Sequence, residues 1–281
     1  MTPVDLHCHS NVSDGLLPPR EVVRLAASRG CKLLALTDHD DTRGLADAAD
    51  EAAQLGVQFV SGVEVSTSWG KHTLHIVGLG FDPAHPAIVG GLTEVRSGRA
   101  ERAQRMSDSL AAKAGVPDAL AGAQKYADNP EILSRTHFAR YLVEIGRAKD
   151  TKSVFKRFLV RGKPGYVEHE WARLHEAIDW IRAAGGVAVM AHPARYDMGH
   201  ETMRVLLTEF KRLGGEGIEV VSGVHGAGDV GRFGRLAQEF GFLASSGTDY
   251  HATGEGARDP GCNPDLPIGC QPVWHRWRGD L

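Results

Sequence analysis

The sequence predicts an α/β protein built as a distorted (β/α)7 barrel with a small helical insertion. Seven short apolar runs alternate with helical patterns, and six of the seven close on a His, Asp or Glu. Near-continuous apolar strands separated by helices indicate a parallel sheet that helices cover. In such barrels the reactive groups gather at the carboxyl ends of the strands. The polar residues that follow the apolar runs therefore favour a barrel.

The predicted strands follow one another along the whole chain. They are residues 4–6 closing on His7, 33–36 on His39, 59–63 on Glu64, 73–74 on His75, 187–191 on His192, 218–221 on a Ser-Gly turn, and 242–246 on Asp249. Between the first three runs, residues 19–29 and 42–55 carry helical patterns. Beyond residue 253 the chain is rich in Gly and Pro, and we expect irregular structure there.

The net charge of -3 divides unevenly along the chain. Residues 99–164 contain 14 Lys or Arg against 7 Asp or Glu, which gives this stretch a net charge of +7. Its patterns predict helices over 99–114, 134–145 and 153–159, with Gly146 ending the middle one. We therefore predict a metal-binding barrel of residues 1–98 and 165–281, and a basic helical insertion, 99–164, that covers the substrate.

Composition is typical of a globular protein from a reducing compartment. A chain of 281 residues with 42% hydrophobic content can fill one barrel core. Its four cysteines lie outside any CxxC spacing, which predicts free thiols. The first predicted strand leaves no room for a signal peptide, and no apolar run approaches the ~20 residues that span a bilayer. We expect a cytoplasmic protein with no membrane partner.

Metal-ligand residue types recur at the run ends with a spacing of two. His7 and His9 point to the same side of an extended segment, and Asp249 and His251 repeat the arrangement. One ion takes ~3 or 4 protein ligands, so nine candidates indicate two or three ions. The nine are His7, His9, Asp14, His39, Glu64, His75, His192, Asp249 and His251.

Other polar residues lie near these candidate ligands in the sequence but are not predicted to bind metal. Asp38, Asp40 and Glu219 are close enough in sequence to orient ligands, to contact substrate, or to satisfy nearby backbone. The remaining histidines lack the strand-end placement, and we expect them on the surface or in packing: His72, His85, His169, His175, His200, His225 and His275.

Ser134, Arg135, Thr136 and His137 open a predicted helix inside the insertion. Ser134 is a suitable N-cap, and the residues after it would bring backbone N–H groups and two basic side chains to a helix N-terminus, which is an anion site in outline. An ordinary capped surface helix has the same local sequence. Further candidate substrate contacts, with solvated surface charges as the alternative, are Arg102, Arg105 and Arg157.

These motifs together resemble a known family. The segments 5–10 (DLHCHS), 13–15 (SDG), 36–40 (LTDHD), 62–64 (GVE), 75–78 (HIVG), 191–193 (AHP) and 248–251 (TDYH) resemble the PHP family, the polymerase and histidinol phosphatase domain. The insertion segment 134–140 (SRTHFAR) resembles a narrower subgroup, the 3',5'-nucleoside bisphosphate phosphatases, which includes the 5'-to-3' exoribonuclease called ribonuclease AM. Every ligand motif is present and in order, which argues for an active enzyme.

The resemblance implies a site of three divalent ions. His7, His9 and Asp249 would bind the first, Glu64 would bridge it to a second held by His75 and His192, and Asp14, His39 and His251 would hold the third. The family favours Mn2+, whereas six imidazoles, three carboxylates and no thiolate leave Mn, Fe, Co and Zn open. The expected nucleophile is a metal-bridging hydroxide held by Glu64 and neighbouring ligands, and no residue is assigned as general acid.

Three functions compete at this point. The first is a phosphoesterase that removes the 3'-phosphate of nucleoside 3',5'-bisphosphates or degrades short 5'-phosphorylated RNA from its 5' end. A histidinol-phosphate phosphatase on the same barrel is the second, and a non-catalytic, metal-stabilised PHP module is the third. A basic insertion favours the first, because a second anion site is needed only by a substrate with a second phosphate. An amide-hydrolysing barrel is disfavoured, since Glu64 fills the position of a bridging Lys.

Overall fold

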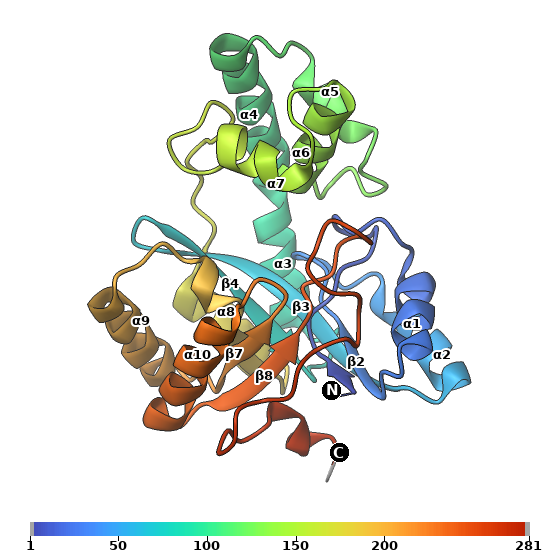
Figure 1. Ribbon diagram of the computed structural model, residues 1–281, viewed down its shortest axis with the longest axis vertical. Coiled ribbons are helices and arrows are strands. Elements are labelled where there is room, and N and C mark those ends of the chain that lie inside the picture. The colour runs from blue at the N-terminus through green and yellow to red at the C-terminus, as the bar shows by residue number, and fades with distance from the viewer. Residues whose placement is uncertain (1–2, 279–281) are drawn as a thin grey trace.

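A sheet of short strands curls into a nearly closed barrel in the lower part of the molecule (Figure 1). The computed structural model describes residues 3–278. Its barrel path is β1 (Val4–Asp5), β2 (Leu33–Leu36), β3 (Gln58–Trp69), β4 (His72–Leu79), β6 (Val187–Met190), β7 (Gly217–Ser222) and β8 (Leu243–Gly247), in that order. The backbone N–H of Leu6 donates to Ser246 O over 2.9 Å, which joins the first and last strands. A short extra strand, β5 (Ala172–Arg173), pairs with β3.

β4 departs from the predicted parallel sheet, because it runs antiparallel to both β3 and β6. Only residues 70 and 71 separate β3 from β4, and a connection this short allows a hairpin but no parallel crossover. Gly70 adopts a φ of +54° in that turn. The predicted strand ends at Glu64 and His75 were also wrong, since both residues lie inside long strands.

Six helices surround the barrel: α1 (Pro19–Ser28), α2 (Leu45–Leu55), α3 (Pro86–Ser97), α8 (Leu174–Ala183), α9 (His200–Arg212) and α10 (Ala227–Phe240). Alternate strand residues divide between two apolar layers. Leu33 and Ala35 face the barrel interior, whereas Leu34 and Leu36 pack under the helices. The short helix η3 (Val273–Arg276) contributes Trp274 to the interior cluster. The polar ends of the strands are thereby carried on a rigid support.

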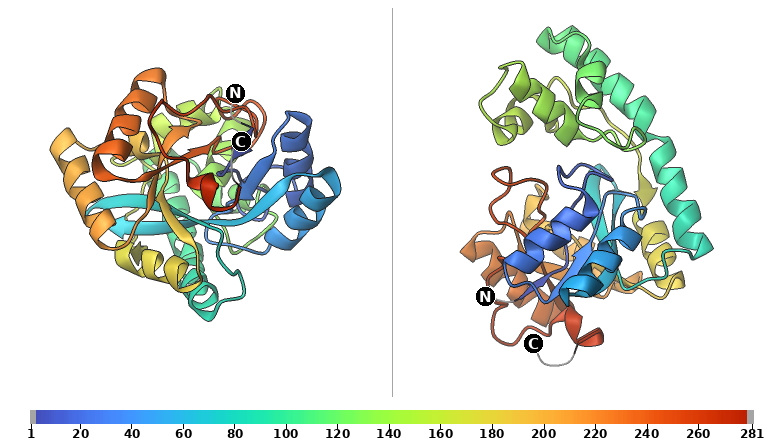
Figure 2. Two further views of the ribbon diagram at one scale, coloured as in Figure 1. Left: turned by 90° about the horizontal axis from the view of Figure 1, so that it is seen from below. Right: turned by 90° about the vertical axis from the view of Figure 1, so that its right-hand side faces the viewer.

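Residues 99–164, hereafter the insertion, stand above the barrel, where the long helix α4 (Arg99–Ala114) carries them away from α3 (Figure 2). Its other helices are α5 (Ala119–Gln124), α6 (Arg135–Glu144) and α7 (Thr151–Val154), which continues into the π turn η1 (Phe155–Leu159). They share a buried cluster that includes Leu110, Phe138, Leu142 and Leu159. The predicted helix over 153–159 exists but begins two residues earlier, and Gly146 follows α6 with a φ of +71°.

The insertion meets the barrel loops through polar contacts. The Arg140 guanidinium donates to both carboxylate oxygens of Glu255, over 2.9 and 2.8 Å. Asn129 Nδ2 donates to Val12 O over 2.8 Å and to Asp41 Oδ2 over 3.1 Å. These contacts hold the N-terminus of α6 over the rim of the barrel. Within residues 3–278 no helix is long and apolar enough to span a membrane, and all four cysteines are free thiols, as predicted.

Candidate metal centre and adjoining anion site

Two ligand-bearing segments lie side by side at the point where the barrel closes. Asp249 N donates to His7 O over 2.7 Å, and His9 N donates to Tyr250 O over 2.8 Å. The side chains of Cys8 and Tyr250 are both buried. Because side chains alternate along extended backbone, His7 and His9 then share one side with their counterparts on the second segment.

The structure brings all nine predicted ligands into one cluster. His9 Nε2 lies 3.1 Å from His7 Nε2, and 3.3 Å from both Glu64 Oε2 and Asp249 Oδ1. His251 Nε2 lies 3.2 Å from Asp14 Oδ1. Glu64 sits at the centre, with imidazole nitrogens of three further residues within 2.9 Å of its carboxylate: His39, His75 and His192.

The donor atoms fit divalent metal ions. Three overlapping groups have their ligand atoms within 4.8 Å of one another: His9, Asp14, His39 and His251; His7, His9, Glu64 and Asp249; and His39, Glu64 and His75. Atoms that share an ion at ~2.0 to 2.2 Å lie within such distances of one another. Among residues 3–278, the buried oxygens Asp14 Oδ1, Glu64 Oε2 and Asp249 Oδ1 accept no hydrogen bond. Oxygens of this kind are available to cations.

Charge in the cluster is balanced between carboxylates and imidazoles. Burial by itself raises the pKa of Glu64, but the surrounding histidines, His39 and His75 foremost, hold that pKa well below its usual value. Burial and the neighbouring His251 lower the pKa of His9 to about 3. Burial also disfavours charge on His7, His39 and His251, but the carboxylates around them raise their pKa values overall, that of His251 to about 9. Metal ions would displace protons from such imidazoles, because a histidine binds metal in its neutral form.

Carboxylates around the cluster fix the ligands in place. His7 Nδ1 donates to Glu219 Oε1 over 2.6 Å, and the backbone N–H of His192 donates to Glu219 Oε2 over the same distance. This leaves His7 Nε2 facing the cluster, as expected for an oriented ligand. Asp38 instead accepts from the hydroxyls of Ser10 and Ser13.

The backbone itself is bent at two ligands. His192 and Asp249 adopt positive φ values of 25° and 53°. Residues other than glycine rarely occupy this region, and such strain persists where the surrounding structure enforces it. The hydrogen bonds of Glu219 to His192 N and of Asp249 N to His7 O supply that enforcement here.

The N-terminus of α6 points into the ligand cluster. Ser134 Oγ donates to Asp14 Oδ2 over 2.7 Å and accepts from Thr136 N over 3.0 Å, while His137 Nδ1 accepts from Ser134 N over 3.2 Å. The prediction of free N–H groups after Ser134 therefore needs correction at Thr136, whose N–H is capped. The positive end of the helix still faces the carboxylate of Asp14, a candidate metal ligand, which is the favourable orientation.

Two of the predicted insertion arginines are desolvated cations without counterions. Arg102 is 6% exposed, and its guanidinium lies 5.2 Å from the centre of the Trp171 ring. Arg135 is half-buried and stacks on Phe155 at 5.7 Å. Within residues 3–278 neither side chain makes a hydrogen bond or an ion pair. Burial lowers the pKa of Arg135, and the positive charge of nearby Arg195 lowers it further.

The other predicted arginines point elsewhere. Arg105 donates to Glu168 O over 2.9 Å, and Arg157 donates to Arg147 O over 2.8 Å, both at the exposed surface. Neither is brought to the ligand cluster. Of the histidines outside the ligand set, His225 is buried in packing against Phe233 and is bonded to Val220 O.

Sequence reasoning missed Arg195 and Arg99. Arg195 lies three residues after His192 and places a guanidinium nitrogen 2.6 Å from Asp249 Oδ2. Arg99 pairs with Asp40, buried below the Trp171 ring. The signal for Arg195 was available, because residues that follow a ligand-bearing strand end belong to the reactive face of a barrel.

Comparison with known proteins places this fold and site in a family. The model of the PHP domain matches residues 5–189, and the chain belongs to that family. A 3',5'-nucleoside bisphosphate phosphatase of Chromobacterium violaceum is 55% identical over 98% of this chain and 96% of its own length. A 5'-3' exoribonuclease of Haemophilus influenzae is 41% identical over 97% of this chain and 98% of its own.

A solved structure agrees closely with the fold. A Chromobacterium violaceum protein, described as an amidohydrolase with bound sulfate and no metal, superposes with a TM-score of 0.95 at 54% identity, covering 98% of this chain and 95% of that one. The predicted fold class, a barrel of the PHP type with helices around it, is confirmed, with β4 reversed.

Proposed function

We propose that this protein is a metal-dependent phosphoesterase that removes the 3'-phosphate of nucleoside 3',5'-bisphosphates and degrades 5'-phosphorylated RNA from its 5' end. One observation carries the proposal: Arg135, which makes no hydrogen bond or ion pair within residues 3–278, stands at the N-terminus of the helix whose Ser134 contacts Asp14. A metal centre and a cationic helix N-terminus side by side suit a substrate with two phosphates. The names of the two relatives support the same substrate class.

The ligand cluster is proposed to hold three ions, of which manganese is the expected metal. His7, His9 and Asp249 form one ligand set, Glu64, His75 and His192 a second, and Asp14, His39 and His251 a third. His9 and His39 also lie within reach of a neighbouring set. When bound, divalent ions here would lower the pKa of a coordinated water and neutralise phosphoryl oxygens.

Residues of the chain itself would position the substrate. Arg135 binds the 5'-phosphate at the α6 N-terminus, with Arg102 adding positive charge beside Trp171. Arg195 is partly exposed next to Asp249, so its guanidinium can also reach a phosphoryl group at the ligand cluster. Binding energy from the distant 5'-phosphate then orients the reacting 3'-phosphate. Residues 99–164 act as a substrate-binding unit over the barrel.

Three alternatives fit the structure less well. Histidinol phosphate has one phosphate and would leave Arg102 and Arg135 without an anionic partner. A non-catalytic module does not require the complete set of nine ligands or the strain at His192 and Asp249. An amide-hydrolysing centre of the kind that uses a bridging Lys is not supported, because the Glu64 carboxylate occupies the centre of the cluster, within 2.9 Å of three imidazoles.

A steady-state comparison of three substrates with added manganese tests the proposal. We expect adenosine 3',5'-bisphosphate and a 5'-phosphorylated oligoribonucleotide to be hydrolysed at kcat/KM values well above that of histidinol phosphate. Activity should vanish with chelator and return with metal. A preference for histidinol phosphate, or no turnover of any of the three in metal-loaded protein, would contradict it.

A further inference from the structure

A second basic surface of the insertion lies outside the site described above. Residues 147–163 contain seven Lys or Arg and one acidic residue, Asp150, so 17 residues carry a net charge of +6. Most of these cations are exposed. Charge of this density repels itself and disfavours the compact state, so its presence needs a partner of opposite charge.

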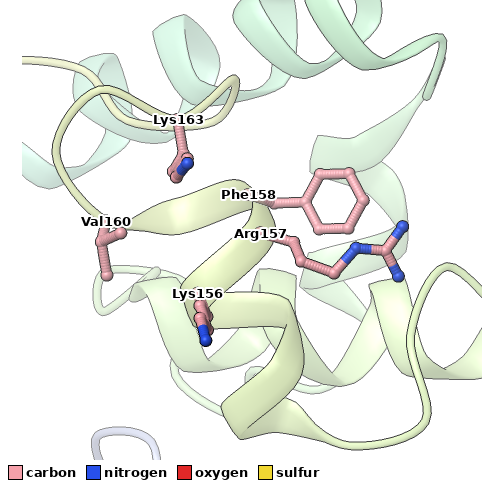
Figure 3. A pocket seen from close by; sticks show the side chains of 5 residues that line it. All are labelled: Lys156, Arg157, Phe158, Val160 and Lys163. Atoms are coloured by element: carbon pink, nitrogen blue, oxygen red, sulfur yellow. The ribbon is translucent and has the colours of Figure 1, made fainter.

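Part of this segment forms an open pocket of about 550 Å3, lined by Lys156, Arg157, Phe158, Val160 and Lys163 (Figure 3). Among residues 3–278, no hydrogen bond or ion pair engages the side chains of Lys156 and Lys163. Arg157 lies over the Phe158 ring at 5.2 Å, and Val160 is 38% exposed. The pocket therefore combines free ammonium groups with an aromatic and an aliphatic surface.

Contacts connect the segment that lines this pocket to both the α6 N-terminus and the β3–β4 hairpin. Phe155, at the start of the same π turn, stacks on Arg135 at 5.7 Å. On the other side, Arg161 donates to Lys71 O over 3.0 Å, at the tip of the β3–β4 hairpin that carries Glu64 and His75. The residues flanking the pocket therefore contact both the element that carries Arg135 and the hairpin that carries Glu64 and His75.

We propose that this pocket binds the backbone of single-stranded RNA, 3' of the nucleotide held at the ligand cluster. Cations that follow a phosphate backbone, beside aromatic side chains on which bases stack, form the general mode of single-strand recognition. A nucleoside bisphosphate has both of its phosphates placed already, so these further cations serve only a longer chain. The inference rests on the proposed ribonuclease function, and it names the part of the protein that favours RNA over mononucleotides.

The test measures RNA affinity without cleavage. Fluorescence anisotropy in chelator compares 5'-phosphorylated oligoadenylates of two, four and eight nucleotides, labelled at the 3' end. Wild-type protein should bind the octamer more tightly than the dimer. K156E/K163E should weaken octamer binding by about 10-fold or more and dimer binding by less than about 2-fold, with the salt slope reduced by ~1.4 for two lost phosphate contacts.

A matched variant separates this pocket from net charge. K32E/R235E makes the same change of -4 on exposed barrel residues and should preserve the length dependence. Turnover of adenosine 3',5'-bisphosphate should be unchanged in both double variants, which also shows that the insertion is folded. K156A/K163A should give an intermediate loss of octamer affinity.

Several results would overturn the inference. The first is an octamer that binds no more tightly than a dimer, and the second is an equal loss of octamer affinity in K156E/K163E and K32E/R235E. The third is polyglutamate that competes for the pocket as well as RNA of equal charge does. Failure of the proposed function looks different, because it appears as absent bisphosphate turnover in metal-loaded protein. The binding measurements contain no metal, so they do not depend on catalysis, and the difference between octamer and dimer reports on the pocket.

Discussion

Two buried charges, Glu64 at the barrel rim and Arg102 in the insertion, differ in whether a group of opposite charge lies beside them. At the rim, Glu64 is surrounded by imidazoles, three of them within 2.9 Å of its carboxylate. In the insertion, Arg102 is almost fully buried and has no carboxylate partner among residues 3–278. A buried charge costs much more free energy alone than within a hydrogen-bonded pair. The rim is therefore a cluster of candidate ligands with balanced charge, whereas Arg102 is a buried cation for which the proposed function supplies an anionic substrate.

This contrast assigns different parts of the function to the two regions. Ligands on strands and strand ends, held by Glu219 and by the hydrogen bond from Asp249 N to His7 O, suit chemistry that needs fixed geometry. Arg102 on α4 and Arg135 on α6 belong to a unit joined to the rim by polar contacts, and in the proposed function they select among substrates. Changes at the rim should affect all substrates alike, and changes in the insertion should affect some and spare others.

The largest effect is expected from Glu64→Gln, which removes the central carboxylate of the cluster. Loss of an outer partner of a metal ligand costs roughly 10- to 100-fold in affinity or activity. Glu64 contacts the ligands directly, so we expect a larger loss of kcat/KM, shared by bisphosphate, 3'-monophosphate and RNA. Metal content, measured by elemental analysis, should fall in parallel, while the cooperative unfolding transition persists.

A buried carboxylate outside the cluster provides the control. Glu51 is 4% exposed and is ion-paired with Arg20 and Arg24, so Glu51→Gln perturbs a buried acid without touching a ligand. Metal content and turnover should then stay at wild-type levels. Full metal occupancy and wild-type rates in Glu64→Gln would remove Glu64 from its proposed bridging role.

The rim was largely predictable from sequence because its signals are local. A spacing of two places His7 beside His9, and an apolar run followed by a polar residue marks a strand end. The hairpin was missed for a physical reason: β3 and β4 continue past the ligands, so Glu64 and His75 lie in mid-strand. Pairing partners are long-range properties that a run of residues does not encode, although Gly70 in a two-residue turn was a usable signal.

Arg135→Ala should have a smaller and selective effect. Removal of a charge-assisted phosphate contact of ~1.5 to 3 kcal/mol lowers kcat/KM for a 3',5'-bisphosphate by roughly 10- to 100-fold. A 3'-monophosphate has nothing to place at the α6 N-terminus, so its hydrolysis should hardly change. The measurement is kcat/KM of wild type and of Arg135→Ala, each with the bisphosphate and with the 3'-monophosphate.

Lys125→Ala is the matched control, because it removes an exposed insertion cation that pairs with Glu144. Both substrates should react at wild-type rates in this variant. An equal slowing of both substrates by Arg135→Ala would mean that the insertion does not hold the 5'-phosphate, and the division of function between rim and insertion would fail.

The insertion was predictable in outline only. Helical periodicity and Gly146 located α6, and the charge count identified a basic region. Burial separated Arg102 and Arg135 from Arg105 and Arg157, and burial depends on packing that brings Trp171 and Phe155 under the guanidinium groups. The four arginine side chains are chemically identical, and only their tertiary contacts make one of them buried, one half-buried and two exposed.

The last expected effect is on stability and leaves turnover aside, and it tests how α6 is fixed over the rim. His137 is buried, and burial lowers its pKa to about 4, below the usual 6.5. The unfolded chain binds a proton at this position below pH 6.5, whereas the folded protein does so only near pH 4. Stability from His137 is therefore present above pH 6.5 and is lost as the pH falls toward 4, by at most about 3 kcal/mol.

His137→Gln removes this titration and keeps an acceptor for Ser134 N, as in a Ser-x-x-Gln capping box. Urea unfolding between pH 6.5 and 4, with chelator throughout so that metal release does not contribute, should show a steeper loss of unfolding free energy for wild type than for the variant. The difference between the two curves isolates His137 from the ligand histidines, which titrate in both proteins. Parallel curves would show that His137 is protonated or solvated in the folded state, and that Ser134 and Asp14 hold the α6 N-terminus without it.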